Sequence, residues 1–315
     1  MAEGKLIVLA VGGNSLITDP KHVTVKAQYQ AAAETAKHIA ALICQGHRVV
    51  IAHGNGPQVG FILRRAELAR HELHMVPLDS CVADTQGAIG YNLQMALQNE
   101  LRRCGCPLTA VTVVTQVVVD PKDPSFSRPA KPIGSFMDRE TAWRHRDEEN
   151  WDIVEDSGRG YRRVVPSPRP LRIVELEAVR ALTARSMPVI TVGGGGIPVV
   201  ENSSGFLEGV EAVIDKDLAA CLLAKQLHAD LFMISTAVEQ ASLYFNTPDQ
   251  QDIAELTCRQ ARHYMDEGHF APGSMLPKME ALTDFVSSTG NIGVLTDPSH
   301  LLAASLGRAG TRVIP

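Results

Sequence analysis

Short apolar runs alternate with amphipathic segments along most of the chain. The apolar runs predict buried strands at residues 5–11, 48–52, 188–192, 230–235, 292–295 and 311–314, and residues 108–119 form a strand-rich run. Helical periodicity predicts helices at residues 25–44, 61–70, 79–101, 172–184, 218–227, 252–267, 277–288 and 298–306. Strand, glycine loop and helix follow one another twice near the start of the chain. This order predicts an α/β protein with an open, mainly parallel, doubly wound sheet flanked by helices.

Residues 120–170 break this alternation. They contain seven of the chain's 18 prolines and many charged residues, so they are too polar for the core, yet the segment YRRVVP within them has the character of a strand. We interpret the stretch as an inserted, protruding lid subdomain within a single domain that spans residues 1–315. We expect the basic residues Arg159, Arg162 and Arg163 in this insertion to form mostly structural ion pairs.

A lysine between two acids opens one of the predicted helices, in the segment GVEAVIDKDL at residues 209–218. Asp215 is suited to be the N-cap, because its carboxylate can accept the free N–H groups of the first turn. Lys216 lies where the positive end of the helix dipole disfavours a cation by roughly 0.3–1 kcal/mol. A bound anion would offset this cost, so the segment has the outline of a phosphate site.

Lys278 and Lys131 are two further candidate cations. Lys278 follows Pro277, which suits the first position of a helix, and Lys131 lies in the predicted lid. Lysine serves phosphate as a compact point charge. Each of these lysines alone could equally be a solvated surface residue. Two lysines at two helix starts favour a doubly held polyphosphate and an enzyme that transfers phosphoryl groups.

Glycine-rich loops follow three predicted strands, at Gly12–Gly13, at residues 54–56 and at residues 193–196. In an open parallel sheet, ligands bind beyond the carboxyl ends of the strands, and glycine lets backbone N–H groups approach phosphate oxygens. A tight turn explains any single loop equally well. Four consecutive glycines are harder to explain in this way, because each glycine costs chain entropy.

Other chemistries have little support in the sequence. The segment GNGPQVG at residues 54–60 has the spacing G-x-G-x-x-x-G, whereas the dinucleotide fingerprint is G-x-G-x-x-G. Neither the P-loop pattern nor the hydrolase pattern G-x-S-x-G occurs. We interpret His53 and His269 as residues that satisfy local hydrogen bonds.

Composition and charge narrow the class of protein further. The net charge of −5 gives no electrostatic case for nucleic acid or an anionic membrane as a partner. No signal peptide and no apolar run of about 18 residues is recognised, which predicts a cytoplasmic protein. The six cysteines form no C-x-x-C pattern, so we expect free thiols, and the sequence indicates no direct metal ligand.

The motifs taken together resemble those of the carbamate kinases, which have the amino-acid-kinase fold. The resemblance covers nearly the whole chain in order, through VGGNSL (11–16), AHGNGPQVG (52–60), PLDSCVADTQGAIGY (77–91), VTQVVVDPKDPSF (114–126), KPIGSF (131–136), EDSGRGYRRVVPSPRP (155–170), VGGGGIPVV (192–200), GVEAVIDKDLAA (209–220) and HFAPGSMLPKMEA (269–281). It implies reversible phosphoryl transfer between carbamoyl phosphate and ADP, giving ATP and carbamate. It also implies Mg²⁺, a homodimer and a lid made by the proline-rich insertion.

The resemblance also implies roles for particular residues. By position, the lysines that handle the phosphoryl group would be Lys131, Lys216 and Lys278, with Asp215 and Asp217 positioning them. The carbamate and phosphoryl cradle would comprise Gly12, Gly13, Asn14, Gly54 and Asn55, and the four-glycine loop adds Gly194 and Gly195. The nucleotide side would comprise Asp217, Thr236, Ala237, Val238, Glu239, Tyr244, Met275 and Lys278. Mg²⁺ would be held mainly by the nucleotide phosphates.

Two positions depart from the family's pattern. Ser15 stands where GGNAL is commoner, and Ala237 replaces the aspartate of a Thr-Asp pair, which leaves the nucleotide preference open. Two alternatives remain: a sister kinase of the same fold with another small substrate, and a catalytically silent paralogue that binds or regulates. The lid motifs KPIG and EDSGRG argue against the first, and the three lysines argue against the second.

Overall fold

The computed structural model describes residues 4–12, 24–156 and 158–315. Gly13 and Asn14 of the expected cradle, and the departure at Ser15, lie outside the described residues. Within the described residues, no helix is long and apolar enough to cross a membrane. All six cysteines are free thiols, as expected.

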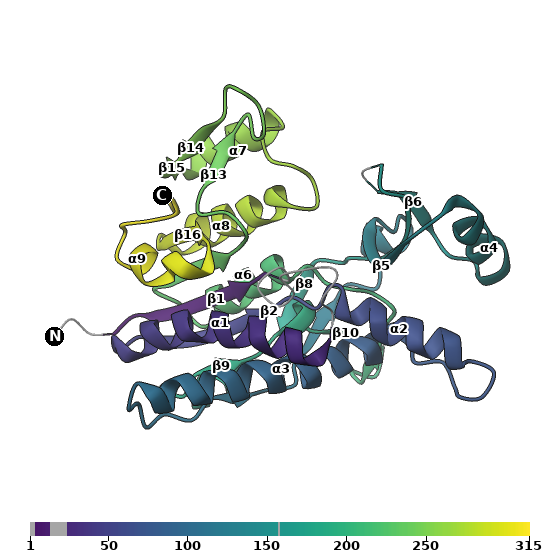
Figure 1. Ribbon diagram of the computed structural model, residues 1–315, viewed down its shortest axis with the longest axis horizontal. Helices are drawn as coiled ribbons and strands as arrows, with labels where there is room; N and C mark the ends of the chain where they lie inside the picture. The colour runs from purple at the N-terminus through teal and green to yellow at the C-terminus, as the bar shows by residue number, and fades with distance from the viewer. Residues whose placement is uncertain (1–3, 13–23, 157) are drawn as a thin grey trace.

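The centre of the protein is a mixed, mainly parallel sheet (Figure 1). Its eight strands among the described residues, in spatial order, are β15 (Glu255–Thr257), β17 (Thr311–Ile314), β16 (Ile292–Thr296), β12 (Leu231–Ser235), β1 (Leu6–Val11), β2 (Arg48–His53), β9 (Val189–Ile190) and β3 (Val111–Thr112). The run from β16 to β3 is parallel throughout, whereas β17 pairs antiparallel with β16. The carboxyl ends of these parallel strands therefore all lie at the same end of the sheet.

Helices bury both faces of this sheet. One face packs on α1 (Val25–Cys44), α3 (Leu78–Arg103) and α9 (Leu301–Ser305), and the other on α5 (Leu176–Ala184), α6 (Lys216–Gln226), α7 (Cys258–Asp266) and α8 (Met275–Thr289). Strand β1 is apolar throughout, with the sequence LIVLAV, because both of its faces are buried. Ile7 and Leu9 belong to the core on the side of α1, α3 and α9. Val8 and Ala10 belong to the core on the opposite side, because successive side chains of a strand point to opposite faces.

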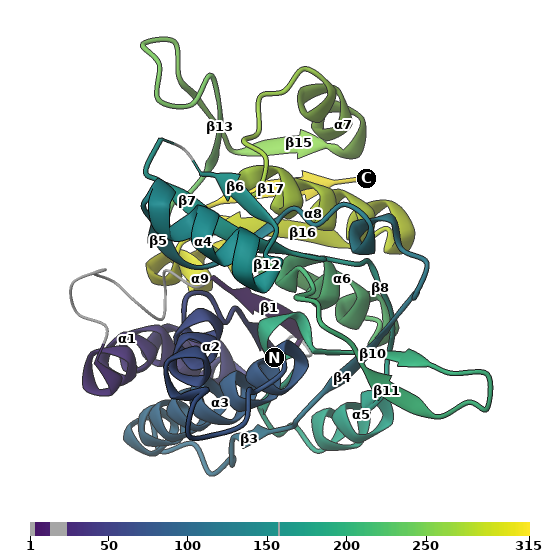
Figure 2. The same ribbon diagram turned by 90° about the vertical axis from the view of Figure 1, so that its right-hand side faces the viewer.

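A smaller four-stranded sheet lies beside the central one (Figure 2). Its order is β11 (Leu207–Gly209), β10 (Ile197–Glu201), β4 (Gln116–Val119) and β8 (Pro170–Ile173). The strand-rich run at residues 108–119 thus divides between two sheets, as β3 and β4. The predicted helix at residues 172–184 is wrong at its start, because Arg172 lies in β8 and the helix begins at Leu176. Pairing of Arg172 with Val118 outweighs the local helical pattern.

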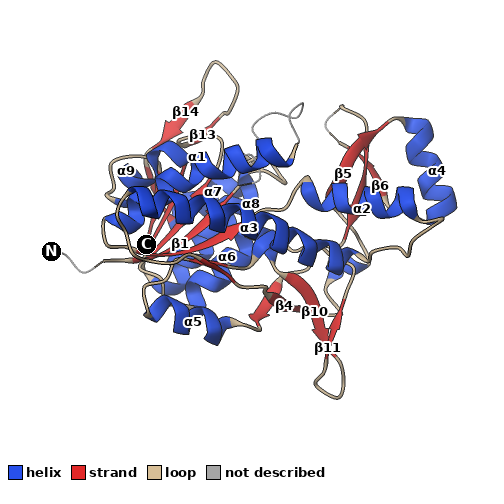
Figure 3. Ribbon diagram, turned by 60° about the horizontal axis from the view of Figure 1, so that its bottom comes forward, coloured by secondary structure: helices blue, strands red, loops and turns tan. Residues whose placement is uncertain are grey.

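The segment expected to be a lid contains a separate unit that protrudes from the body (Figure 3). We call residues 131–165 the protruding unit. It comprises β5 (Lys131–Met137), α4 (Arg139–Glu149), β6 (Ile153–Glu155) and β7 (Tyr161–Val165), with the strands in the order β5-β7-β6. Arg162 and Arg159 pair with Asp156 at 3.0 and 3.8 Å, as predicted. Arg163 instead lies over the ring of Trp151, at 4.7 Å from its centroid.

Two further helix predictions need correction. The predicted helix at residues 252–267 begins only at Cys258, because its first residues belong to β14 (Gln251–Ile253) and β15. A capping box between Thr257 and Gln260 fixes that start. Pro277 is the third residue of α8, which begins at Met275. The first four N–H groups of a helix have no partner within it, so proline is tolerated there as well.

Candidate active site

Three lysines from separate parts of the fold meet around two aspartates at the start of α6. Lys131, on β5 of the protruding unit, donates to Oδ2 of Asp215 at 3.0 Å. Lys216, the first residue of α6, lies 2.5 Å from Oδ1 of Asp217. Lys278, on α8, donates to Oδ2 of Asp217 at 3.2 Å. The charges therefore alternate along a line of contacts, as three cations and two anions with a net charge of +1.

Asp215 is the N-cap of α6, as predicted. Its Oδ1 accepts the N–H groups of Asp217 and Leu218, at 2.9 and 3.4 Å, and this leaves Oδ2 for Lys131. Burial alone would raise the pKa of Asp215, but the charges of Lys131 and Lys216 hold that pKa at about 2. The carboxylate is therefore ionised at every physiological pH.

Asp217 is the most buried charge of the group, with 3% of its side chain exposed. It accepts from two lysines, so removing either one leaves the other to compensate it. Burial lowers the pKa of Lys216, while the neighbouring Asp217 acts to raise it. Lys278 also donates to the carbonyl of Ser274 at 3.1 Å, which orients its ammonium group back toward the first turn of α8.

The glycine loops come together beside these charges. A Cβ atom built on Gly194 would lie 2.3 Å from Nδ2 of Asn55, and one built on Gly195 would lie 2.4 Å from the carbonyl oxygen of Ile214. Gly194 and Gly195 have φ angles of +67° and +92°. The four-glycine loop thus packs between the loop after β2 and the residue that precedes Asp215, which only glycine permits.

The other two glycine loops use their N–H groups within the sheet. Gly12 donates to the carbonyl of Ser235, and Gly54 donates to the carbonyl of Val11, both at 3.0 Å. These amides extend the strand pairing, so they are engaged in this structure. A Cβ atom on Gly12 would lie 3.0 Å from the same Ser235 oxygen.

Two residues of α3 that we did not single out from the sequence hold this region in place. Asn55 is buried and donates to Oγ1 of Thr85 at 3.3 Å. Gln86 donates to the carbonyls of Gly193 and Thr115 and accepts the N–H of Thr115. Both lie in the segment PLDSCVADTQGAIGY, but only the fold brings them against residues about 30 and 107 positions away.

The histidine next to this loop is buried and neutral. His53 lies at the end of β2, and its Nδ1 is 3.0 Å from the carbonyl of Gly54. Burial lowers the pKa of His53 to about 4. This agrees with the interpretation of His53 as a local hydrogen-bonding residue.

The residues expected on the nucleotide side lie on two neighbouring segments. Tyr244, after β13 (Ala241–Leu243), has its ring edge-on to His269, with centroids 4.7 Å apart, and half of its surface is exposed. Met275 packs against the core at the start of α8, the helix that carries Lys278. The N–H of Thr236, directly after β12, donates to the carbonyl of Thr296 at the end of β16, at 2.9 Å. The next residue, Ala237, is exposed.

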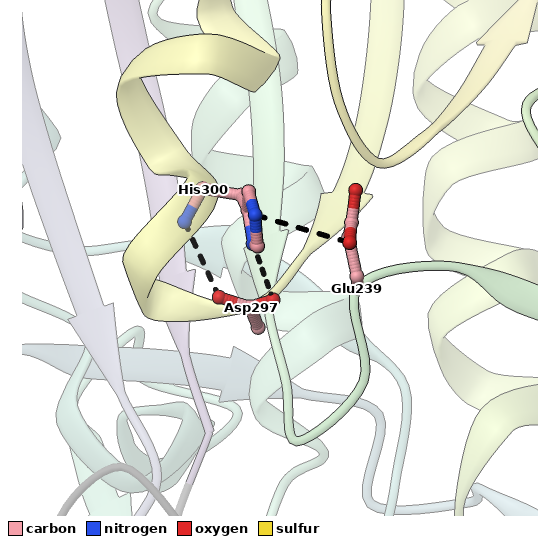
Figure 4. A group of neighbouring side chains, drawn as sticks. All are labelled: Glu239, Asp297 and His300. Atoms are coloured by element: carbon pink, nitrogen blue, oxygen red, sulfur yellow. Dashed lines mark hydrogen bonds and ion pairs between the residues drawn. The ribbon is translucent and has the colours of Figure 1, made fainter.

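Glu239, Asp297 and His300 form a further polar cluster at the carboxyl ends of β12 and β16 (Figure 4). Nδ1 of His300 lies 2.7 Å from Oδ2 of Asp297, and its Nε2 lies 3.9 Å from Glu239. Asp297 also caps the turn through Ser299. The bond to Asp297 raises the pKa of His300. These two contacts of His300 join the three side chains in one polar network.

A family model places the protein in a class. The model of the amino acid kinase family matches residues 5–295, which is most of the chain. Among curated relatives, a carbamate kinase-like protein of Escherichia coli is 47% identical over 98% of this chain and 99% of its own. The carbamate kinase of Pyrococcus furiosus is 44% identical over 99% of this chain and all of its own.

Solved structures give the same result. The carbamate kinase of Giardia lamblia bound to AMP-PNP superposes with a TM-score of 0.92 and is 39% identical, over 100% of this chain and 99% of that one. The chain therefore belongs to the amino acid kinase family and, within that family, to the carbamate kinases. The expected fold and enzyme class are both confirmed.

Proposed function

We propose that this protein transfers a phosphoryl group reversibly between carbamoyl phosphate and ADP, with the lysine–aspartate cluster as its catalytic centre. The observation that carries the proposal is the meeting of Lys131, Lys216 and Lys278 at the N-terminus of α6. Phosphoryl transfer asks a protein mainly to position the reactants and to stabilise charge on the equatorial oxygens. Three ammonium groups that converge from three elements, next to the positive end of a helix, supply both.

In this mechanism each lysine exchanges a carboxylate partner for phosphate oxygens. Lys131 approaches from the protruding unit, and Lys216 and Lys278 approach from the body. Asp215 and Asp217 keep the three cations apart and oriented before the anion arrives. The four-glycine loop packs directly against Asn55 and the carbonyl of Ile214. We assign Gly194, Gly195, Gly54 and Asn55 to the cradle for carbamate and the transferred group.

The nucleotide is proposed to lie along the start of α8 and the segment that follows the carboxyl end of β12. The AMP-PNP complex of the Giardia lamblia enzyme supports a nucleotide site in this fold. The exposed ring of Tyr244 and the thioether of Met275 offer apolar contact for a base, and Lys278 is one turn further along the same helix. Thr236, Ala237 and Val238 complete this side of the site.

We propose that magnesium reaches this site with the nucleotide. In this structure Asp215 and Asp217 both accept from lysines, so we assign the binding of Mg²⁺ mainly to the nucleotide phosphates. Mg²⁺ commonly binds substrate phosphates and keeps several waters. When bound in this way it would neutralise charge on the phosphate oxygens.

The homodimer is also proposed. Strand β3 lies at the edge of the central sheet, where its outer backbone groups can pair with another chain. Tyr91 on α3 and Val114 after β3 are 63% and 56% exposed, so apolar surface adjoins that edge. Light scattering on the purified protein should give twice the chain mass of 34.0 kDa.

The test is ATP formation from ADP, Mg²⁺ and carbamoyl phosphate, with Lys216→Ala and Lys225→Ala measured alongside. Lys225 is the matched control, because it lies on the same helix and pairs with Asp284 at 2.7 Å, away from the cluster. We expect Lys216→Ala to lose most of the activity while it stays folded, since Lys278 still compensates Asp217. Lys225→Ala should retain activity.

Two outcomes would change the proposal. Near-normal turnover in Lys216→Ala would refute the role of this lysine. A folded parent that forms no ATP would favour another phosphate acceptor or a silent paralogue.

A further inference from the structure

The protruding unit touches helix α2 (Gln58–Ala69) backbone to backbone at a pair of glycines. A Cβ atom built on Gly60 would lie 2.5 Å from Cα and 2.8 Å from N of Gly134, and these are the atoms nearest to it. Contacts below 3.0 Å do not occur for real Cβ atoms, so no other residue fits at position 60 unless β5 moves. Around this contact the packing is open, because a cavity of about 280 Å³ lies between Leu63 and Glu67 of α2 and Phe136 and His145 of the unit.

Gly134 lies at an irregularity in β5. The pairing of β5 with β7 shifts register between Ile133 and Met137, and the φ angle of Gly134 is +71°. A glycine in the left-handed region at such a shift is characteristic of a β-bulge, which bends a strand. The bend and the glycine contact coincide, so the path of β5 is set at this residue.

The same strand carries Lys131, three residues earlier. Between the two residues, Ile133 is buried in a small core with Val59 and Leu63 of α2 and with Val213, which is two residues before Asp215. Lys131 ends 3.0 Å from Asp215. Helix α2 therefore connects at its N-terminus to the Gly54–Asn55 loop and, through Gly60, to the strand that delivers Lys131.

We infer that the close backbone contact between Gly60 and Gly134 fixes the position at which Lys131 meets the catalytic centre. Both glycines are positioning residues, because neither reaches the reacting atoms. This inference rests on the role proposed above for Lys131. This contact holds β5 against α2, and α2 begins just after the Gly54–Asn55 loop. The contact therefore sets the distance between Lys131 and that loop.

The size of the expected displacement follows from the contact distance. Ordinary van der Waals contact begins at 3.4 Å, so a methyl group now 2.5 Å from Gly134 Cα would push β5 away by roughly 0.9 Å. Displacing a catalytic group by about 1 Å can cost on the order of 100-fold in rate. We therefore expect Gly60→Ala to lower kcat about 10- to 100-fold.

The experiment measures kcat and KM for ATP formation in Gly60→Ala, with Arg65→Ala as control. Arg65 is an exposed residue of the same helix, so its truncation should leave kcat within about twofold of the parent. In Gly60→Ala we expect kcat to fall while the KM for ADP and the thermal stabilisation by AMP-PNP are retained, because the proposed nucleotide side lies on other elements. A folded Gly60→Ala with parental kcat overturns the inference.

A double-mutant cycle with Lys131→Ala shows whether the glycine acts through this lysine. If it does, adding Gly60→Ala to Lys131→Ala lowers kcat by less than about threefold more, because coupled residues are not additive. Fully additive losses overturn the inference. Failure of the proposed function gives a different result, namely a parent without ATP formation or a Lys131→Ala protein with full activity.

Discussion

Substituting Asp215 by asparagine separates the two roles of this residue. Asparagine is as good an N-cap as aspartate, so the bonds to the N–H groups of Asp217 and Leu218 should survive. The negative charge that faces Lys131 and Lys216 is removed. A change in stability therefore reports the charge interaction and not the loss of the cap.

The magnitude follows from the depressed pKa of Asp215. Its pKa falls from 3.8 to about 2 in the folded protein, and each pKa unit corresponds to about 1.36 kcal/mol, which gives about 2.5 kcal/mol for the free energy of unfolding. Because the folded-state pKa is the lower one, this contribution is fully present well above pH 3.8 and is lost as the pH falls toward 2. At pH 3 about half of it should remain.

Urea unfolding of the parent and Asp215→Asn at pH 7 and at pH 3 measures both quantities. Asp138→Asn is the matched control, because Asp138 also caps a helix, α4, through the N–H of Thr141, but it is exposed and has no lysine partner at hydrogen-bonding distance among the described residues. We expect a smaller deficit for it than for Asp215→Asn, because the N–H of Thr141, rather than a lysine, is the main cause that lowers the pKa of Asp138. A deficit in Asp215→Asn that is as large at pH 3 as at pH 7, or no deficit at pH 7, would refute the reasoning.

Two further predictions follow from local geometry. Gly195→Ala should lower the free energy of unfolding by about 1–3 kcal/mol, because φ is +92° there and the new methyl group meets the Ile214 carbonyl; an unchanged urea midpoint would contradict this. Asp297→Asn should lower the pKa of His300 toward 6.5, because Asp297 is the main cause that raises it. An NMR titration of the His300 ring measures that pKa, and a value that stays raised would contradict the prediction.

Much of the fold was predictable where local signals and tertiary packing agree. Helix α1 runs over the predicted residues 25–44, with Thr24 as its cap, and β17 also matches its prediction. The predictions fail where pairing with a segment distant in the sequence determines the secondary structure. Residues 172–173 have helical periodicity, yet β8 pairs with β4, which lies more than 50 positions earlier in the chain. Periodicity carries no information about such pairing.

The charged part of the candidate site was predictable because its signals are local. A lysine at a helix N-terminus is anomalous in any fold, and this led to Lys216 and Lys278. The supports were not predictable in the same way. Thr85 and Gln86 look like ordinary polar residues of a helix until the fold sets them against Asn55 and Gly193. The Gly60 contact likewise becomes visible only once β5 lies against α2.

The alternation of lysines and aspartates has a consequence for turnover. In an enzyme that works through these lysines, every incoming phosphoryl group competes with Asp215 and Asp217 for the same ammonium groups, and every departing one returns the lysines to those carboxylates. The carboxylates act as resident counterions that weaken the binding of substrate and product alike. Such internal competition keeps release easy in both directions, as a freely reversible reaction requires.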